Sequence, residues 1–180
     1  MAALFLDRDG VINRRIVDGY VTRPADFVLI DGVLEAIVLF AKRFDRIFIV
    51  TNQQGIGKGL MTEADLEAVH SGLLRQVAEA GGRIDRIYHC PNLKSDHSFM
   101  RKPSIGMALR ARREFPDVVL HQSVMVGDTA SDMLFGRRAG MQTVLVGDDT
   151  GLARSKSHLV DLSFPDLIGY ARYLEAKGLF

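Results

Sequence analysis

Two aspartates stand two positions apart near the start of the chain, within the stretch FLDRDGVIN at residues 5–13. Asp7 and Asp9 would repel each other and be costly to desolvate unless a positive charge lies beside them. A further aspartate, Asp128, follows an apolar run much later in the chain. Three converging carboxylates suit a hard divalent cation, and oxygen ligands of this kind favour magnesium. We therefore expect Mg²⁺ to bind a carboxylate oxygen of Asp7, the backbone carbonyl of Asp9 and a carboxylate oxygen of Asp128.

Other side chains could bind an anion beside that cation. Thr51 and Asn52 follow an apolar run and offer a hydroxyl, an amide and backbone N–H groups, with glycines after them that let the backbone approach closely. Lys102 could neutralise a phosphoryl group and an attacking aspartate, because an ammonium is a compact positive charge. Asp132 stands one helical turn after the third aspartate, where it could orient Lys102, orient a metal-bound water or be a plain surface carboxylate.

The elements that must position these groups alternate between short β-branched or aromatic runs and longer amphipathic segments. This alternation predicts strands at 2–6, 46–51, 84–89, 122–127 and 142–146, and helices near 33–43, 62–80, 104–114, 129–139 and 165–176. Nearly continuous apolar strands indicate a mainly parallel sheet with helices on both faces, which is a doubly wound α/β fold. Ligands bind at the carboxyl ends of such strands, where Asp7, Thr51 and Asp128 fall, so the sequence predicts one site at one edge of the sheet.

Length and composition limit the class of protein. A chain of 180 residues with 47% hydrophobic residues predicts a single domain over residues 1–180. The 23 basic and 22 acidic residues give a formal net charge of +1, so no global field favours nucleic acid or an anionic membrane. Cys90 has no partner for an intrachain disulfide, and neither an export signal nor a membrane-spanning stretch is visible. We expect a soluble cytoplasmic monomer.

Four motifs resemble those of the haloacid dehalogenase (HAD) superfamily of phosphotransferases in their order and spacing, and the match covers most of the chain. They are Asp7-x-Asp9-Gly10, Thr51-Asn52, Lys102-Pro103 and Gly127-Asp128-x-x-x-Asp132. More narrowly, the chain looks like the D-glycero-D-manno-heptose 1,7-bisphosphate phosphatases, with the histidinol-phosphatases close behind. The stretches that carry this narrower resemblance are FLDRDGVIN, DGYV at 18–21, VTNQQGIGKG at 50–59, YHCP at 88–91, RKP at 101–103 and MVGD at 125–128.

The resemblance implies a HAD-like phosphatase with a minimal cap and a defined role for each matching residue. Asp7 would be the nucleophile that forms an aspartyl phosphate, and Asp9 the general acid and then the base. Thr51 and Lys102 would stabilise the phosphoryl group, and Asp128 would bind Mg²⁺. The expected substrate is a small phosphorylated metabolite, foremost the 7-phosphate of heptose 1,7-bisphosphate. The substrate-binding residues would be Gly10, Asp18, Gly19, Tyr20, Asn52, Gln53 and Arg101.

One departure from that family concerns zinc. These phosphatases commonly hold a structural zinc before the RKP motif with a Cys-x-His pair and a Cys-x-Cys pair. The corresponding positions here are Cys90 with Asn92 and Ser98 with Met100, so one of four ligands remains. That is too few for a closed tetrahedral site, and we expect no zinc. The loop should then be ordered by packing of Phe99 and Met100.

Alternatives remain at three points. Histidinol-phosphate or another sugar phosphate could be the substrate, and a non-catalytic phosphate-binding or phosphoacceptor domain is an alternative of another class. The sequence argues against a receiver domain, which needs no acid two residues after its nucleophile. A group of basic residues could favour a second substrate phosphate or could be solvated surface charges: Arg14, Arg15, Arg23, Lys58 and Arg101. The histidines at 70, 121 and 158 show no partner and are interpreted as ordinary surface or core residues.

Overall fold

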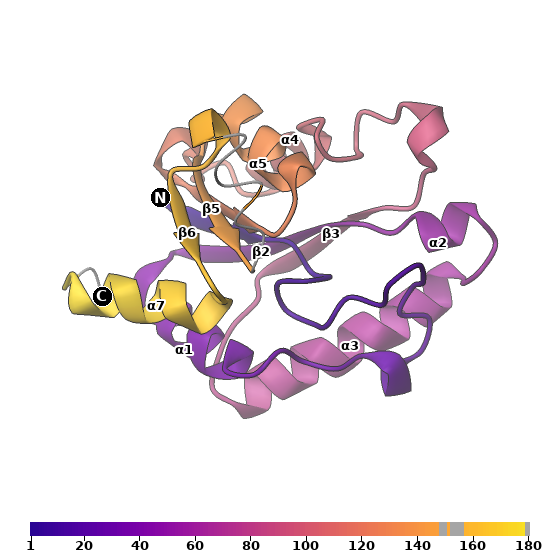
Figure 1. Ribbon diagram of the computed structural model, residues 1–180, viewed down its shortest axis with the longest axis horizontal. Helices are drawn as coiled ribbons and strands as arrows, with labels where there is room; N and C mark the ends of the chain where they lie inside the picture. Colours follow the sequence, from indigo (N-terminus) through magenta and orange to yellow (C-terminus); the bar gives the residue numbers. More distant parts are fainter. Residues whose placement is uncertain (148–150, 152–156, 179–180) are drawn as a thin grey trace.

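The apolar strands of the chain form one parallel sheet (Figure 1). The computed structural model describes residues 1–147, 151 and 157–178. Its strand order is β3-β2-β1-β4-β5-β6, and every neighbouring pair is parallel. The strands are β1 (Ala3–Leu6), β2 (Arg46–Asn52), β3 (Arg86–Cys90), β4 (Val124–Gly127), β5 (Gln142–Val146) and β6 (Leu162–Phe164).

Helices cover both faces of this sheet. Side chains of a strand alternate between faces, so Leu4 and Leu6 pack with one set of helices while Ala3 and Phe5 pack with the other. The first set is α1 (Val33–Arg43), α3 (Glu63–Glu79) and α7 (Leu167–Ala176), and the second is α4 (Gly106–Glu114) and α5 (Ala130–Arg138). Figure 1 shows the first set below the sheet and the second above it. The predicted doubly wound α/β fold is confirmed.

Among the described strands and α-helices, two short elements were not predicted. One is β6, three residues at the edge of the sheet, and the other is the one-turn helix α2 (Gln54–Gly57). The remaining described elements include 3₁₀ turns at Pro24–Asp26, Lys94–Asp96, Leu120–Gln122 and Ser157–Leu159. Each strand and helix that was predicted begins and ends within two residues of its expected boundaries, which is the usual uncertainty of such boundaries.

The register of the central strands brings the predicted site residues to one edge. Leu6 of β1 pairs with Ile49 of β2 and with Val126 of β4, so the carboxyl ends of these three strands lie at the same edge of the sheet, with β2 extending to Asn52. Asp7 extends the contact, since its N–H donates to the carbonyl of Val126 at 2.9 Å. None of the described helices has the length and apolar character needed to cross a membrane.

Candidate active site

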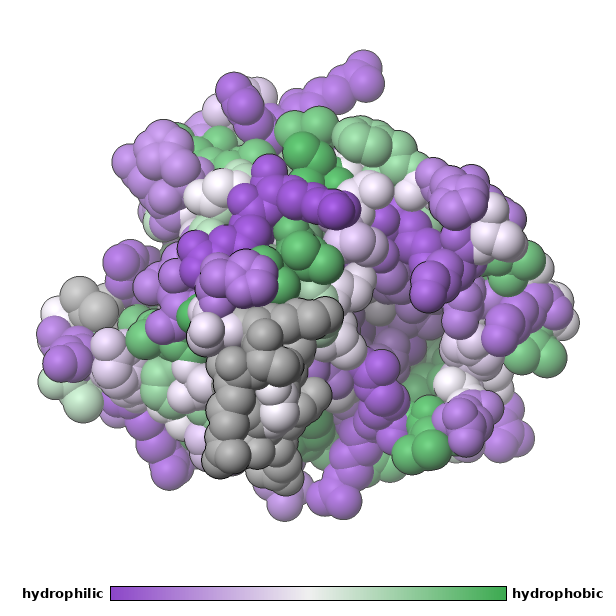
Figure 2. Space-filling model, turned by 45° about the horizontal axis from the view of Figure 1, so that its top comes forward, coloured by the Kyte–Doolittle hydropathy of each residue, from purple (hydrophilic) through white to green (hydrophobic). Residues whose placement is uncertain are grey.

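A cavity of about 1290 Å³ lies over the carboxyl ends of β1, β2 and β4. Its lining comes from those strand ends, from residues 15–21 and from the loop before α4. In Figure 2 the molecule is hollowed to the right of its centre, and most of the residues that line the cavity are polar or charged. A polar cavity at this position of a parallel sheet is where ligands of doubly wound proteins bind.

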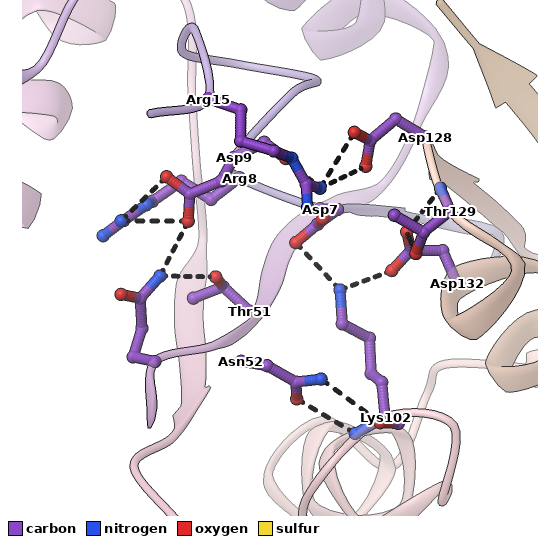
Figure 3. Close-up of polar contacts among 11 residues, drawn as sticks. Asp7, Arg8, Asp9, Arg15, Thr51, Asn52, Lys102, Asp128, Thr129 and Asp132 are labelled. Carbon is purple, nitrogen blue, oxygen red and sulfur yellow. Dashed lines mark hydrogen bonds and ion pairs between the residues drawn. The ribbon is translucent and has the colours of Figure 1, made fainter. Parts of the chain in front are cut away.

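A buried lysine lies between two buried aspartates on the floor of this cavity (Figure 3). Lys102 Nζ is 2.8 Å from Asp7 Oδ1 and 2.6 Å from Asp132 Oδ1. Lys102 is 4% exposed and Asp7 is 6% exposed. Burial raises the pKa of Asp7 to about 7, although Lys102 opposes the shift. Burial would lower the pKa of Lys102, but Asp132 and Asp7 together raise it, so the lysine is a permanent cation.

Asn52 and Thr129 hold the two flanks of this charged row. The Asn52 amide accepts from the backbone N–H of Lys102 at 3.0 Å and donates to its carbonyl at 3.2 Å. Thr129 forms a capping box with Asp132 at the start of α5, in which its backbone N–H donates to Asp132 Oδ2 at 3.0 Å. Asp132 is therefore a buried partner of Lys102 and a helix cap, not a surface carboxylate.

The carboxylate of Asp9 accepts hydrogen bonds from three side chains. Arg8 Nη2 donates to both oxygens at 3.0 Å, Asn13 donates to Oδ1 at 3.0 Å, and Gln53 donates to Oδ2 at 2.9 Å. Gln53 also bridges to the hydroxyl of Thr51 at 2.8 Å. Burial acts to raise the pKa of Asp9, but Arg8 and the other hydrogen bonds bring it below its ordinary value. The carboxylate is thus fixed in direction and ionised at neutral pH.

A guanidinium occupies the place where a cation was predicted. Arg15 Nη2 donates to the backbone carbonyl of Asp9 and to both carboxylate oxygens of Asp128, each at 2.9 Å. Ligand oxygens of Asp7, Asp128 and Asp132 also lie within 4.8 Å of one another. Burial raises the pKa of Asp128 to about 6, while Arg15 opposes the shift. Two of the three predicted Mg²⁺ ligands therefore already share one positive partner.

Gly10 and Gly127 allow the chain segments to approach this closely. A Cβ atom on Gly10 would lie 2.1 Å from Asp128 Oδ2, and Gly10 has a φ of +95°, a region that favours glycine. A Cβ atom on Gly127 would lie 2.1 Å from the Cβ of Asp132. The predicted role of Gly10 in substrate binding is not evident from its position, since it faces Asp128 and is not part of the cavity lining.

The remaining predicted substrate residues lie in the cavity wall, and the basic residues divide into two groups. The wall contains Asp18, Gly19, Tyr20, Asn52, Gln53 and Arg101. Of the five basic residues singled out, Arg15, Lys58 and Arg101 also line the cavity. Arg14 and Arg23 do not, and they pair with Asp31 and Asp26 on the surface. Lys94 and His97 line the cavity without having been predicted.

Sequence reasoning missed the neighbours of Asp9. His70 was interpreted as an ordinary surface or core residue without a partner. It is a buried residue, but it does have a partner, since its Nε2 lies 3.1 Å from Arg8 Nη1. Its position on the inward stripe of α3, with Leu66, Leu73 and Val77, is the signal that could have indicated burial. Nothing in its spacing could have indicated Arg8. His121 and His158 are exposed, as expected of surface residues.

The loop before α4 was expected to be ordered by packing of Phe99 and Met100, and this expectation is only half right. Met100 packs against the core beneath α4, but Phe99 is 59% exposed, so the expected packing of Phe99 is wrong. Hydrogen bonds fix the loop instead, with Arg101 donating to the carbonyl of Asn92 at 3.1 Å and Gly106 donating to that of Phe99 at 3.1 Å. The thiol of Cys90 is buried, and its nearest polar partners are an amide and a hydroxyl, Asn92 and Ser98.

Comparisons with known proteins agree with this geometry. A HAD-hydrolase-like family profile matches residues 99–167. A D-glycero-alpha-D-manno-heptose-1,7-bisphosphate 7-phosphatase of Campylobacter jejuni is 42% identical over 144 residues, which cover 80% of this chain and 81% of the relative. A phosphatase of the same name from Mycobacterium bovis is 35% identical over 175 residues, which cover 94% of this chain and 92% of the relative.

Solved structures show the same relationship. A crystal structure of D,D-heptose 1,7-bisphosphate phosphatase from B. bronchiseptica, complexed with magnesium and phosphate, superposes with a TM-score of 0.86. It is 32% identical, and the alignment covers 98% of this chain and 99% of the other. Fold and site together define a phosphoric monoester hydrolase of the HAD superfamily. Within that class, the chain belongs to the family of D-glycero-D-manno-heptose-1,7-bisphosphate 7-phosphatases.

Proposed function

We propose that this protein removes the 7-phosphate from D-glycero-D-manno-heptose 1,7-bisphosphate through an aspartyl phosphate on Asp7, with Mg²⁺ as cofactor. The observation that carries the proposal is the row formed by Asp7, Lys102 and Asp132 beside the oxygens of Asp128 and Asp9, at the bottom of a polar cavity. The family relationship supports the choice of substrate, because the relatives are named for this bisphosphate.

The residues fit a bound Mg²⁺. The donors are hard oxygens, namely the carboxylates of Asp7 and Asp128 and the backbone carbonyl of Asp9. A positively charged group, the Arg15 guanidinium, contacts two of them at 2.9 Å, so the site already attracts a cation. When bound, Mg²⁺ would act as a Lewis acid and neutralise charge on the phosphoryl oxygens. The related crystal structure is complexed with magnesium, which supports Mg²⁺ as the cofactor.

Asp7 and Lys102 would carry out the first half of the reaction. A carboxylate oxygen of Asp7 attacks phosphorus, an O–P bond forms, and the bond from phosphorus to the sugar oxygen breaks. A phosphate ester dianion repels a carboxylate, so the attack needs positive charge beside both groups. Lys102 supplies it at 2.8 Å from Asp7, and the Thr51 hydroxyl and Asn52 are in the cavity wall to bind the phosphoryl group. Burial of Asp7 removes water that would otherwise screen this interaction.

Asp9 would handle the proton in both halves. Asp9 is ionised in the free protein, and a phosphate dianion bound beside it would raise its pKa so that it takes up a proton from solvent. As an acid it would give this proton to the departing sugar oxygen, and as a base it would then remove a proton from the water that attacks the phosphorus of aspartyl phosphate. The second attack breaks the bond from phosphorus to Asp7, which releases inorganic phosphate and restores the free carboxylate. Arg8, Asn13 and Gln53 would hold Asp9 in one direction through these transfers.

The rest of the cavity would bind the sugar and its second phosphate. Lys58, Lys94 and Arg101 also line the cavity, and their positive charges would hold a second phosphate group. The relatives include enzymes named for the alpha anomer and for the beta anomer. Both anomers are therefore substrates to compare.

The absence of zinc is a further part of the proposal. It is supported by the surroundings of Cys90, whose nearest polar partners are Asn92 and Ser98, neither of which is a good zinc ligand. Elemental analysis of protein purified without chelator should find zinc well below one atom per chain, and a stoichiometric amount would contradict it. A single domain, a monomer and a cytoplasmic location stay predictions from the sequence.

Phosphate release from a panel of substrates tests the proposed function. The panel contains both anomers of the heptose bisphosphate, histidinol phosphate and a simple sugar monophosphate, each with Mg²⁺ and with chelator. We expect the highest kcat/KM on a heptose bisphosphate, loss of the phosphorus-31 NMR signal of the 7-phosphate, and no turnover with chelator or in Asp7→Asn. A higher kcat/KM on histidinol phosphate, or full turnover by Asp7→Asn, would contradict the proposal.

A further inference from the structure

We propose that His70 is a positioning residue for proton transfer, because its ring nitrogen holds the guanidinium of Arg8, which in turn holds the carboxylate of Asp9. The inference rests on the proposed function in one respect, namely that Asp9 is the acid and base of the reaction. It gives a role in the reaction to α3, a helix that contributes no side chain to the cavity wall.

The two ends of the Arg8 guanidinium have different partners. Nη2 donates to both oxygens of Asp9 at 3.0 Å, and Nη1 lies 3.1 Å from Nε2 of His70. The third nitrogen, Nε, is buried and has no partner among the described residues. Arg8 is 0% exposed, and its guanidinium also lies 5.8 Å from the ring centre of Phe27. Its direction therefore depends on Asp9 at one end and on His70 at the other.

His70 is suited to this contact as a neutral acceptor. Arginine can only donate, so Nε2 of His70 must carry its lone pair toward Arg8. Burial lowers the pKa of His70 to about 3, the neighbouring Arg8 and His89 add to the shift, and Asp9 opposes it. The ring therefore keeps an acceptor nitrogen at neutral pH, and it is held on the inward stripe of α3 next to Leu73.

Loss of this acceptor would leave a buried cation with one partner fewer. Asn13 and Gln53 each hold one oxygen of Asp9, but neither holds Arg8. A second, smaller cavity of about 370 Å³ borders His70 on the outer side of α3 and β3. Without the ring, that cavity would give Arg8 access to water, because a buried donor seeks a hydrogen-bond partner. The carboxylate of Asp9 would then lose the fixed direction that Arg8 imposes on it.

His89 offers a matched control. Its ring centre lies 6.3 Å from that of His70, it borders the same smaller cavity, and its Nε2 is 2.8 Å from Glu63. Its ring bonds to Glu63 at the surface and not to Arg8, so its loss should not affect Asp9. A neutral acceptor at position 70 provides the complementary test, because the amide oxygen of His70→Gln can still accept from Arg8.

Two substrates separate a positioning role from general damage to the site. A sugar phosphate needs an acid to protonate its alkoxide leaving group, whereas p-nitrophenyl phosphate releases a stable anion and does not. We expect His70→Leu to lose about tenfold to a hundredfold in kcat/KM on the sugar phosphate. On p-nitrophenyl phosphate the loss should stay within about threefold, because attack by Asp7 is unaffected. His70→Gln and His89→Leu should stay near wild type on both substrates.

Equal losses on both substrates, or no loss on the sugar phosphate, would overturn the inference. Should His70→Leu fail to fold, His70→Thr removes the reach to Arg8 with a smaller change in polarity and is measured in the same way. Asp9→Asn distinguishes a failure of the proposed function. If kcat/KM of that variant falls equally on the sugar phosphate and on p-nitrophenyl phosphate, Asp9 is not the acid, whatever His70 does. Thermal unfolding and Mg²⁺ binding, measured for every variant, should be those of a folded protein that binds the metal.

Discussion

Lys102 balances the charge of the site at the scale of single residues. Two buried carboxyl groups face one ammonium, so the row carries net negative charge whenever both are ionised, before any cation or substrate arrives. Removing one partner of a buried ion pair is costly because the other charge stays behind without compensation. The same surplus of negative charge favours a divalent cation at the oxygens of Asp128 and Asp9.

Replacing Lys102 tests this balance. Lys102→Met keeps the aliphatic stem and removes the charge that stabilises the attacked phosphoryl group. We expect turnover with saturating Mg²⁺ to fall by about 10²-fold to 10³-fold and the free energy of unfolding to fall by about 3 kcal/mol or more. Lys42→Met, which removes an exposed lysine in the last turn of α1 outside the cavity wall, is the control and should keep kcat. A kcat within about threefold of wild type in Lys102→Met would contradict the role given to the lysine.

Arg15 offers a prediction about metal binding. Its guanidinium contacts the oxygens that would bind Mg²⁺, so the ion must displace it. A partly exposed ion pair contributes at most about 1 kcal/mol, so we expect Arg15→Ala to bind Mg²⁺ about threefold to fivefold more tightly by calorimetry. Arg14→Ala removes an adjacent arginine that pairs with Asp31 on the surface and should leave Mg²⁺ affinity unchanged. Weaker binding by Arg15→Ala would show that the guanidinium assists the metal.

The buried His70 makes stability depend on pH. Its pKa is lowered from 6.5 to about 3 in the folded protein. Below pH 6.5, therefore, the imidazole is protonated in the unfolded chain but stays neutral in the folded protein. Stability from this group is therefore complete above 6.5 and is lost as pH falls toward 3. Between pH 7 and pH 5 wild type should lose about 2 kcal/mol relative to His70→Gln in urea unfolding. The charged and titratable groups that face position 70, Arg8, Asp9 and His89, are present in both proteins. The same dependence of unfolding free energy on pH in wild type and in His70→Gln would contradict the prediction.

At the scale of elements, the turn from β4 into α5 positions two of the aspartates. Gly127 ends the strand, Asp128 follows it, and Asp132 returns to cap the helix through Thr129. The capping box fixes the first turn of α5, so it also fixes the carboxylate that holds Lys102. The lack of a side chain at Gly127 is a requirement of this turn, since a Cβ atom there would lie 2.1 Å from that of Asp132.

Gly127→Ala is therefore expected to damage both stability and turnover. Relieving the clash must shift Asp132, because the strand on the other side is fixed in the sheet. We expect a loss of about 1–3 kcal/mol in unfolding free energy, together with reduced kcat because Lys102 loses its partner. Gly72→Ala is the control, since a Cβ atom on this α3 residue meets nothing within 4 Å. That variant should gain stability, as alanine favours helix, and keep kcat. A Gly127→Ala variant with the unfolding free energy and kcat of wild type would contradict the account of the turn.

At the scale of the whole molecule, the sequence predicts the sheet well because buried parallel strands leave continuous apolar runs. Of the six strands in the described part of the chain, five were predicted in this way, within two residues at each end. The exception, β6, has three residues at an edge of the sheet and is only partly buried, so it leaves no such run. Likewise α2 contains two glycines in four residues, which obscures a helical signal.

Some features of the site could likewise be predicted from the sequence, and others could not. Asp7, Thr51 and Asp128 could be predicted to converge because each lies at or just after the carboxyl end of a strand, and strand ends meet at one edge of a parallel sheet. The contacts of His70 with Arg8 and of Arg15 with Asp128 could not, because they join α3 or a loop to the sheet at distances that only the folded chain defines. The roles given to all these residues stay predictions until variants are measured.

The central claim is that Asp7 accepts the phosphoryl group. Asp9→Asn should still be phosphorylated by p-nitrophenyl phosphate with Mg²⁺, since that leaving group needs no acid, and should hydrolyse the intermediate slowly without its base. Acid quench, borohydride reduction and mass spectrometry of the peptides should then find a reduced acyl phosphate at Asp7 in a large fraction of chains. Release of nitrophenolate without any modified Asp7, or with the modification on another residue, would contradict the account.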